Sequence, residues 1–228
     1  MRKLHCALVP AMIFSFAGAV HAGLVKNLST GINDATAQKL ANNAPDTDYK
    51  MGTPTVSPYT GVVPITRSTP ISANWVQDAD SPDSSWIVLN TGNGPNGITA
   101  GPGSYTFETT FDMTGFDPAT AKLSALRYTA DDELLAILIN GTAVFNHASD
   151  GNGQFFNWKN IAAGLGVGRF KTGTNAIDFV VLNEVGQVTP MGFRLEGSVQ
   201  ADPVPEPASF TLFAIAGGLL LGRRRRAI

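Results

Sequence analysis

Short runs of alternating apolar and polar residues dominate the chain from residue 86 onward. The stretch WIVLN, residues 86–90, is a compact apolar run that predicts a buried strand. The stretch SYTFETTF, residues 104–111, alternates instead, because every second side chain of a strand points to the same face. The residues that share its predicted inward face are Tyr105, Phe107, Thr109 and Phe111.

A hairpin is predicted where Asn140-Gly141 separates two apolar runs in ELLAILINGTAVFNH, residues 133–147. Asn-Gly is the preferred pair for a two-residue type I′ turn, since both positions need a positive φ. The segments AKLSALRYTA, AIDFVVLNE and GFRLEGSVQ add further short strands with turn residues between them. This regular spacing predicts an all-β fold, a β-sandwich with one core between two sheets.

Two segments before residue 86 follow a different pattern. Residues 23–45 are polar and rich in Ala and Asn, and DATAQKLAN within them favours one short helix. Residues 52–70 are dense in proline, which confines them to loops or an edge strand. We therefore expect the sandwich to occupy residues 46–200.

The N-terminus has the organisation of a secretory signal peptide. Arg2 and Lys3 precede an apolar stretch, and Ala22 supplies the small residue that a signal-peptidase site requires. We expect residues 1–22 to direct export by the Sec machinery and to be removed by signal peptidase. An uncleaved membrane helix is the alternative, which the short run interrupted by Pro10 disfavours.

The C-terminus joins a Pro-Glu-Pro motif, an apolar run and a basic cluster. Residues 208–222 are 15 uncharged residues, and four arginines follow them directly. As a helix this run spans about 22 Å, against about 30 Å for a bilayer core. The arginines would stay cytoplasmic by the positive-inside rule. A buried C-terminal helix with a solvated basic end is the alternative, but it leaves the arginines unexplained.

This tail resembles the PEP-CTERM sorting signal of Gram-negative bacteria, with the motif at residues 204–208, the membrane helix at 208–222 and the basic tail at 223–226. The resemblance implies processing by an exosortase, a membrane-embedded transpeptidase that cleaves near the motif. It further implies an inner-membrane-anchored precursor whose body reaches the cell surface or the extracellular matrix. The residues that carry the resemblance are Pro205, Glu206, Pro207, Arg223, Arg224, Arg225 and Arg226.

Removing both ends makes the remaining body acidic. Two of the 16 Lys and Arg residues lie in the signal peptide and four in the basic tail, whereas all 18 Asp and Glu residues lie between them. The body therefore carries 10 basic against 18 acidic residues and a net charge of about −8. This charge argues against nucleic acid and anionic lipid as partners.

Three segments of the body resemble the galactose-binding-like jelly-roll modules of bacterial surface proteins. The segments are DSSWIVLN, GSYTFETTFDMTGFDPATAKLSALRYTADDELLAILINGTAVF and FKTGTNAIDFVVLNEVGQVTPMGFRLEG. The resemblance implies a jelly-roll β-sandwich. It leaves the ligand open, because such modules bind sugars, proteins or no known partner.

The body lacks the residue sets of the common hydrolases, and we expect it not to be an enzyme. Its only histidine is His147, expected in a solvated loop, and Cys6 lies in the signal peptide. No nucleophile-elbow or zinc-protease motif occurs. Asp131, Asp132 and Glu133 are adjacent on a strand and point to opposite faces, so they are poorly placed to flank a glycosidic bond. We expect Asp131 and Asp132 to accept hydrogen bonds from backbone N–H groups instead.

No cofactor is implied, apart from a candidate calcium site. Asp78, Asp80 and Asp83 alternate in the loop QDADSPDS, a spacing that lets carboxylate oxygens converge on Ca²⁺. Asp46 and Asp48 would be further ligands. The loop lacks the glycine and the distal glutamate of an EF-hand.

Carbohydrate binding is the function that the aromatic residues favour, with exopolysaccharide as the expected partner. Trp75 and Trp158 lie in loop-like contexts, where an aromatic face can stack on a sugar ring, whereas Trp86 belongs to an apolar strand. A structural or adhesive surface protein without a sugar site is the alternative. Arg194 and Glu184 are further hydrogen-bonding candidates, and the predicted binding residues are Trp75, Trp158, Tyr105, Arg127 and Asn183.

Overall fold

Antiparallel pairing joins the strands of the body into two main sheets. The computed structural model describes residues 22–53, 59–68, 73–90, 99–184 and 188–204. The six-stranded sheet runs in the order β12–β9–β15–β6–β5, and β1 also pairs with β15. Its strands are β12 (Gln154–Asn160), β9 (Lys122–Asp131), β15 (Gly192–Ala201), β6 (Trp86–Val88), β5 (Ile65–Arg67) and β1 (Gly23–Asn27).

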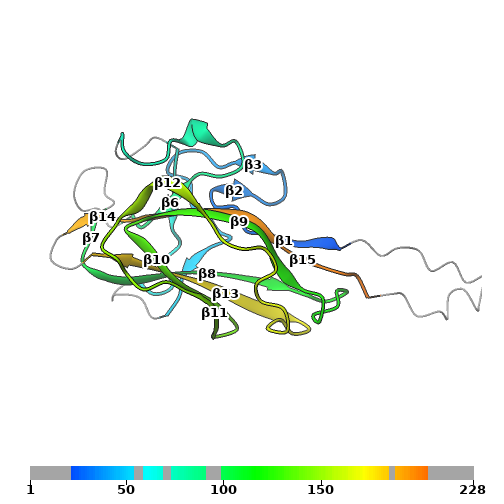
Figure 1. Cartoon of the computed structure of the whole chain (residues 1–228). Helices are drawn as coiled ribbons and strands as arrows, with labels where there is room; N and C mark the ends of the chain where they lie inside the picture. The colour runs from blue at the N-terminus through cyan, green and yellow to red at the C-terminus, as the bar shows by residue number, and fades with distance from the viewer. Residues whose placement is uncertain (1–21, 54–58, 69–72, 91–98, 185–187, 205–228) are drawn as a thin grey trace, which may run out of the picture.

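The five-stranded sheet runs in the order β11–β10–β13–β8–β4 and lies against the first (Figure 1). Its strands are β11 (Thr142–Asn146), β10 (Glu133–Ile139), β13 (Thr174–Asn183), β8 (Gly103–Asp112) and β4 (Lys50–Met51). Short elements complete the described chain: β2 (Ile32–Asn33) with β3 (Gln38–Lys39), β7 (Thr99–Ala100) with β14 (Thr189–Pro190), and the 3₁₀ turn η1 (Asp78–Asp80).

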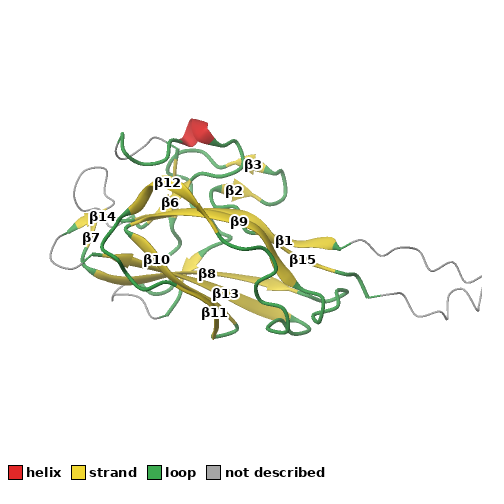
Figure 2. Ribbon diagram, viewed as in Figure 1, coloured by secondary structure: helices red, strands yellow, loops and turns green. Residues whose placement is uncertain are grey.

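The core lies between the two sheets and is centred on three buried phenylalanines. The ring centroid of Phe193 on β15 lies 5.4 Å from that of Phe107 on β8 and 5.2 Å from that of Phe179 on β13. All three are fully buried, so aromatic contacts join one layer to the other. The predicted all-β sandwich is confirmed, and strands dominate the described chain (Figure 2). The finer jelly-roll assignment stays a prediction.

The alternation read from the sequence positions these side chains correctly. Tyr105, Phe107 and Thr109 are buried on β8, and β6 is buried throughout. The predicted hairpin joins β10 to β11, where Asn140 has a φ of 50° and Gly141 a φ of 78°. Both values fit the left-handed conformations that a type I′ turn demands.

Two expectations about the N-terminal part are corrected. No helix forms at residues 34–42, where Asn33 Oδ1 accepts hydrogen bonds from the backbone N–H groups of Ala35 and Thr36 and organises a turn before β3. The sandwich also begins before residue 46, because β1 pairs with β15. The edge strand β5 is consistent with the proline-rich character of its surroundings.

Strand register defines two ends of the sandwich. Gly23 is the register partner of Ala201, so the described chain begins and ends at one end, which we name the terminal end (Figure 1). At the other end of β15, Gly192 pairs with Asp131, and we name this the distal end. Among the described residues, no helix has the length and apolarity to cross a membrane. The predicted signal peptide, the helix at 208–222 and the sorting-signal residues lie outside the described residues.

Candidate functional site

The outer face of the six-stranded sheet carries charged residues over its centre. On β15, Phe193 and Leu195 point into the core. Arg194 lies between them and Glu196 follows Leu195, so both of these side chains point to the outer face. On β9, Tyr128 enters the core and its neighbour Arg127 points outward. Arg127 and Glu196 are register partners, which brings two opposite charges together on this face.

Arg127 joins Trp158 to this charged face. Its guanidinium carbon lies 4.5 Å from the centroid of the Trp158 ring, a cation–π arrangement. Its Nε donates to Glu196 Oε2 at 2.5 Å, and its side chain is 38% exposed. Glu196 also accepts a hydrogen bond from Ser84 Oγ at 2.7 Å, and these hydrogen bonds hold its pKa below the ordinary value although burial opposes them. Arg127 and Trp158 therefore form a partly exposed pair, and their predicted contact with a ligand stays a prediction.

Arg194 lies beneath this pair and is fully buried. Its guanidinium donates to the backbone carbonyls of Gln77 (2.8 Å), Ser81 (3.2 Å) and Ser84 (2.9 Å), and Nε donates to Ser84 Oγ at 2.8 Å. The guanidinium carbon also lies 5.0 Å from the centroid of the Trp158 ring. Burial lowers the pKa of Arg194, and nearby acidic groups oppose this. The residue thus holds residues 77–84 on the sheet and is not available to a ligand.

Trp158 belongs to β12 and not to a loop, which corrects its predicted context. The strand lies at the edge of the six-stranded sheet, and the partly buried Trp158 packs against the cluster formed by Trp75 and Trp86. Its neighbour Phe156 is 51% exposed, and the ring centroids of Phe155 and Phe156 lie 4.0 Å apart. Sequence reasoning missed Phe156, although the adjacent aromatics of QFFNWKN were a usable signal.

The other three predicted binding residues are buried, and the expectation that they contact a ligand is corrected. Trp75 is 3% exposed and its ring stacks on Trp86 with centroids 4.1 Å apart. The Tyr105 hydroxyl donates to the carbonyl of Gly101 at 2.8 Å. Asn183 Nδ2 donates to the carbonyls of Ala100 and Gly101 at 2.9 and 3.0 Å. These side chains satisfy backbone groups of neighbouring loops and leave no surface for a sugar.

The predicted calcium residues do not converge on a common point. Asp78 accepts hydrogen bonds from Lys39 Nζ at 2.8 Å and from Ser85 Oγ at 2.6 Å. Asp80 accepts one from the backbone N–H of Gln77 at 2.7 Å and so stabilises the turn η1. Asp83 is exposed and lines a separate cavity. Within the described ranges, the group with metal-ligand geometry is a different one, Glu133, His147 and Asp150.

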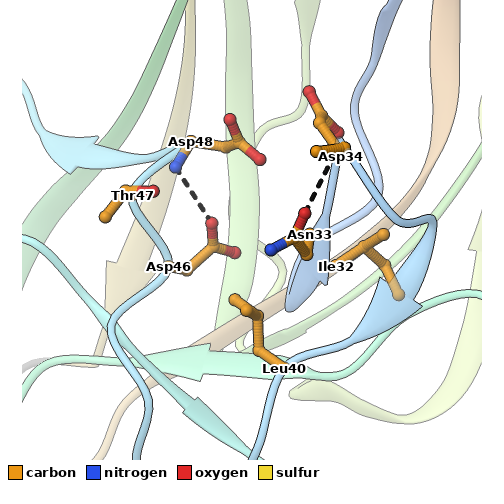
Figure 3. A pocket seen from close by; sticks show the side chains of 8 residues that line it. Ile32, Asn33, Asp34, Leu40, Asp46, Thr47 and Asp48 are labelled. Carbon is orange, nitrogen blue, oxygen red and sulfur yellow. Dashed lines mark hydrogen bonds between the residues drawn. The ribbon is translucent and has the colours of Figure 1, made fainter.

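An acidic pocket at the N-terminal side already contains a cation of the protein itself. The pocket has a volume of about 230 Å³, and the carboxylates of Asp34, Asp46 and Asp48 line it (Figure 3). Lys26 Nζ bonds to Asp34 and, at 3.0 Å, to Asp48. Asp46 accepts the backbone N–H groups of Gly31 (2.7 Å) and Asp48 (3.1 Å), and its burial raises its pKa to about 6. The Lys26 ammonium therefore neutralises the carboxylates of Asp34 and Asp48, as a calcium ion was expected to do for the aspartates.

A second cavity, of about 390 Å³, lies beside Glu196 and Gly197 of β15. Glu196, which binds Arg127, is one of its walls, and Asp83 and Ser29 supply further oxygen atoms. The cavity therefore offers oxygen atoms beside the Arg127–Glu196 ion pair, through which it is connected to Trp158. We call Trp158, Arg127, Glu196 and this cavity the β12-edge site.

Asp131 and Asp132 form a carboxyl pair at the distal end. Asp132 Oδ2 accepts the backbone N–H of Glu184 at 2.7 Å, in agreement with the prediction for this residue. Asp131 is 6% exposed and interacts instead with the side chains of Asp132 and Trp75. Burial, together with the Asp132 side chain, raises the pKa of Asp131 to about 9.

The comparisons with known proteins leave the family open. No family model matches the chain, and no curated protein matches it. Among solved structures, the chain is similar to one described as "Structure of a family 35 carbohydrate binding module from an environmental isolate". That match has a TM-score of 0.30 and 12% identity, and it covers 71% of this chain and 97% of the other. A TM-score this low carries no weight for fold or ligand, both of which rest on the contacts described above.

Arg194 provides a test of how residues 77–84 are held. The Arg194→Met variant keeps the length of the side chain but leaves three carbonyls and a hydroxyl without their donor. We expect the free energy of unfolding to fall by about 3 kcal/mol. The matched variant Arg127→Met removes a partly exposed charge and should cost less than about 1 kcal/mol. Urea denaturation followed by tryptophan fluorescence measures both, and equal losses would contradict the assigned role.

Asp131 predicts an unusual dependence of stability on pH. Its carboxyl has a pKa of about 9 in the folded chain against about 3.9 when unfolded. The folded state therefore binds more protons in this window, and the residue makes stability fall as the pH rises from about 4 to about 9.

The Asp131→Asn variant should remove this contribution, because an amide resembles the protonated carboxyl. Its free energy of unfolding should exceed that of the wild type by an amount that grows from pH 5 to pH 8. Asp112→Asn is the control, since the exposed Asp112 has a lowered pKa through its hydrogen bonds with Thr114. Parallel pH profiles for the wild type and Asp131→Asn would show that Asp131 is ionised in the fold.

Proposed function

We propose that this protein is a non-catalytic, carbohydrate-binding β-sandwich of the cell surface or extracellular matrix, with an exopolysaccharide as its partner. The observation that carries the proposal is the partly exposed pair of Trp158 and Arg127, which an ion pair joins to Glu196 at the wall of the second cavity. The part of the indole that the Arg127 guanidinium leaves uncovered offers an apolar surface for the C–H groups of a pyranose. The partly exposed guanidinium of Arg127 offers planar hydrogen-bond donors for its hydroxyls, and Glu196 fixes the orientation of that guanidinium.

The neighbouring strand residues extend this surface. Phe156 is 51% exposed on the same edge strand, two residues before Trp158 and therefore on the same face of the strand. An edge strand with exposed aromatic side chains is suited to a long, flexible polymer, because successive sugar units can follow it. The buried Arg194 supports the proposal, because its hydrogen bonds fix the residues beneath Trp158. A fixed Trp158 lowers the entropy cost of binding.

Export and sorting form the second part of the proposal. The residues at 1–22 and 201–228 support it by their resemblance to a signal peptide and a PEP-CTERM signal. Register adds support, because Gly23 and Ala201 are partners and both processing signals therefore adjoin the terminal end. A body attached through that end would present its distal end to the surroundings. The passage of successive strands between the two sheets supports the jelly-roll assignment.

Removing the Trp158 ring tests the binding proposal. Trp158→Ala should weaken binding to exopolysaccharide isolated from the host by at least about tenfold, the loss expected for an aromatic platform. Phe156→Ala should cause a smaller loss, and Val167→Ala, which shortens a 58% exposed side chain on another loop, should cause none. Isothermal titration and a glycan array measure these effects.

The result also separates binding from a purely structural role. If the wild-type protein binds no polysaccharide, or if Trp158→Ala binds as well as the wild type while remaining folded, the β12-edge site is not a sugar site. A structural or adhesive role would then be favoured. Far-ultraviolet circular dichroism of each variant distinguishes lost binding from lost folding.

Replacing the four terminal arginines with glutamine tests the sorting proposal. We expect the variant precursor to be retained poorly in the membrane and processed less completely, because the positive-inside signal is gone. Intact-mass analysis of the membrane and culture fractions should show a wild-type body that begins at Gly23 and ends near Pro205–Pro207. Unchanged masses and unchanged surface display in the variant would contradict the proposal.

A further inference from the structure

A fully buried carboxylate at the distal end has no hydrogen-bond partner among the described residues. Glu133 begins β10, its exposed fraction is 0%, and neither Oε1 nor Oε2 accepts a hydrogen bond there. Removing an ionised carboxylate from water costs several kcal/mol unless a cation or a donor compensates for it. The position therefore demands a partner that the described side chains do not supply.

The nearest basic group does not satisfy this demand. His147 Nε2 lies 3.8 Å from Glu133 Oε2, which is longer than a hydrogen bond, and Nε2 is itself buried without a partner. The Nε2 atom of His147 is therefore buried, which corrects the expectation that this histidine is fully solvated. The imidazole is held in place because the His147 backbone N–H donates to the carbonyl of Leu135 at 2.7 Å. Two unsatisfied polar atoms consequently face each other across a small gap.

Asp150 completes the group from the following loop. One oxygen of Asp150, one of Glu133 and one ring nitrogen of His147 all lie within 4.8 Å of one another. Asp150 is exposed, and its Oδ1 accepts the backbone N–H of Asn152 at 3.0 Å. Gly151 and Gly153 flank that residue, so the loop can move inward at little cost.

We propose that Glu133, His147 and Asp150 bind a divalent transition-metal ion, with Zn²⁺ as the best match to the donors. One imidazole nitrogen with two carboxylate oxygens is a zinc-type set, whereas Ca²⁺ takes six to eight oxygen ligands. Two ligand atoms on a tetrahedral zinc ion lie about 3.3 Å apart, so a contraction of the present group suffices. The two positive charges of the ion balance the two negative charges of the carboxylates.

The ion would join the loop at 147–153 to the start of β10. That loop leads directly into β12, the strand that carries Trp158. Metal binding would therefore stiffen the chain next to the β12-edge site, although the metal site itself does not depend on the proposed carbohydrate function. The two proposals can fail separately.

Zinc titration of the full chain tests the site. We expect one Zn²⁺ ion per chain by isothermal titration and a higher melting temperature in its presence, because the ion binds the folded state. His147→Gln and Asp150→Asn should each weaken this binding at least tenfold and abolish the increase in melting temperature. Cys6, His5 and His21 give the same background in every variant wherever the signal peptide is retained.

Two further variants make the outcome decisive. Asp112→Asn removes an exposed carboxylate outside both proposed sites and should bind zinc as the wild type does. Glu133→Gln removes the buried charge and should abolish zinc binding; if it fails to fold, the exposed Asp150 variant decides. Equal zinc binding by the wild type, His147→Gln and Asp150→Asn would overturn the site. Equal affinity for Ca²⁺ and Zn²⁺ would overturn its assignment to a transition metal.

Discussion

The buried guanidinium of Arg194 is the interaction on which the arrangement of the outer face depends. It sits on β15, which pairs with β1, β6 and β9, and it binds three carbonyls of residues 77–84. An apolar residue of the same size would avoid the desolvation cost but would leave those carbonyls without donors. The Arg194 guanidinium therefore fixes the path of residues 77–84 across the sheet. The contacts of the residues on either side of this segment depend on that path.

Residues 77–84, which Arg194 fixes, are connected through neighbouring hydrogen bonds to the edge of the sheet. Just before them, the Val76 backbone N–H donates to the carbonyl of Phe155 at 2.9 Å, and Trp86 Nε1 donates to the carbonyl of Val76 at 2.8 Å. These bonds connect the covering segment with β12 and with β6. Trp158 is consequently supported from below by Arg194 and from the side by the Trp75–Trp86 cluster, while Arg127 remains at the solvent. The partly exposed ring of Trp158 is held in one position, because Arg194 and the Trp75–Trp86 cluster that contact it are buried.

The distal end of the sandwich holds two buried carboxyl groups, those of Asp131 and Glu133. The terminal end holds the start of β1 and the end of β15, where the chain begins and leaves its folded part. The distal end holds the Asp131–Asp132 pair, and Glu133 follows it directly. Buried carboxyls there retain protons or require a cation, because the low dielectric of the interior disfavours isolated charge. This end is thus the chemically distinctive part of the body.

The sequence by itself determined the all-β sandwich from the spacing of its short strands, the β10–β11 hairpin from the Asn140-Gly141 pair, and the inward face of β8 from the alternation of its side chains. The pairing of Trp158 with Arg127 was within the predicted binding set, but their meeting depends on β12 lying beside β9. Only the tertiary structure decided that Trp75, Tyr105 and Asn183 are buried. It also decided that Lys26 neutralises the N-terminal aspartates and that Glu133 faces His147. Burial and charge partners arise from contacts between strands far apart in the chain, and local spacing carries no information about them.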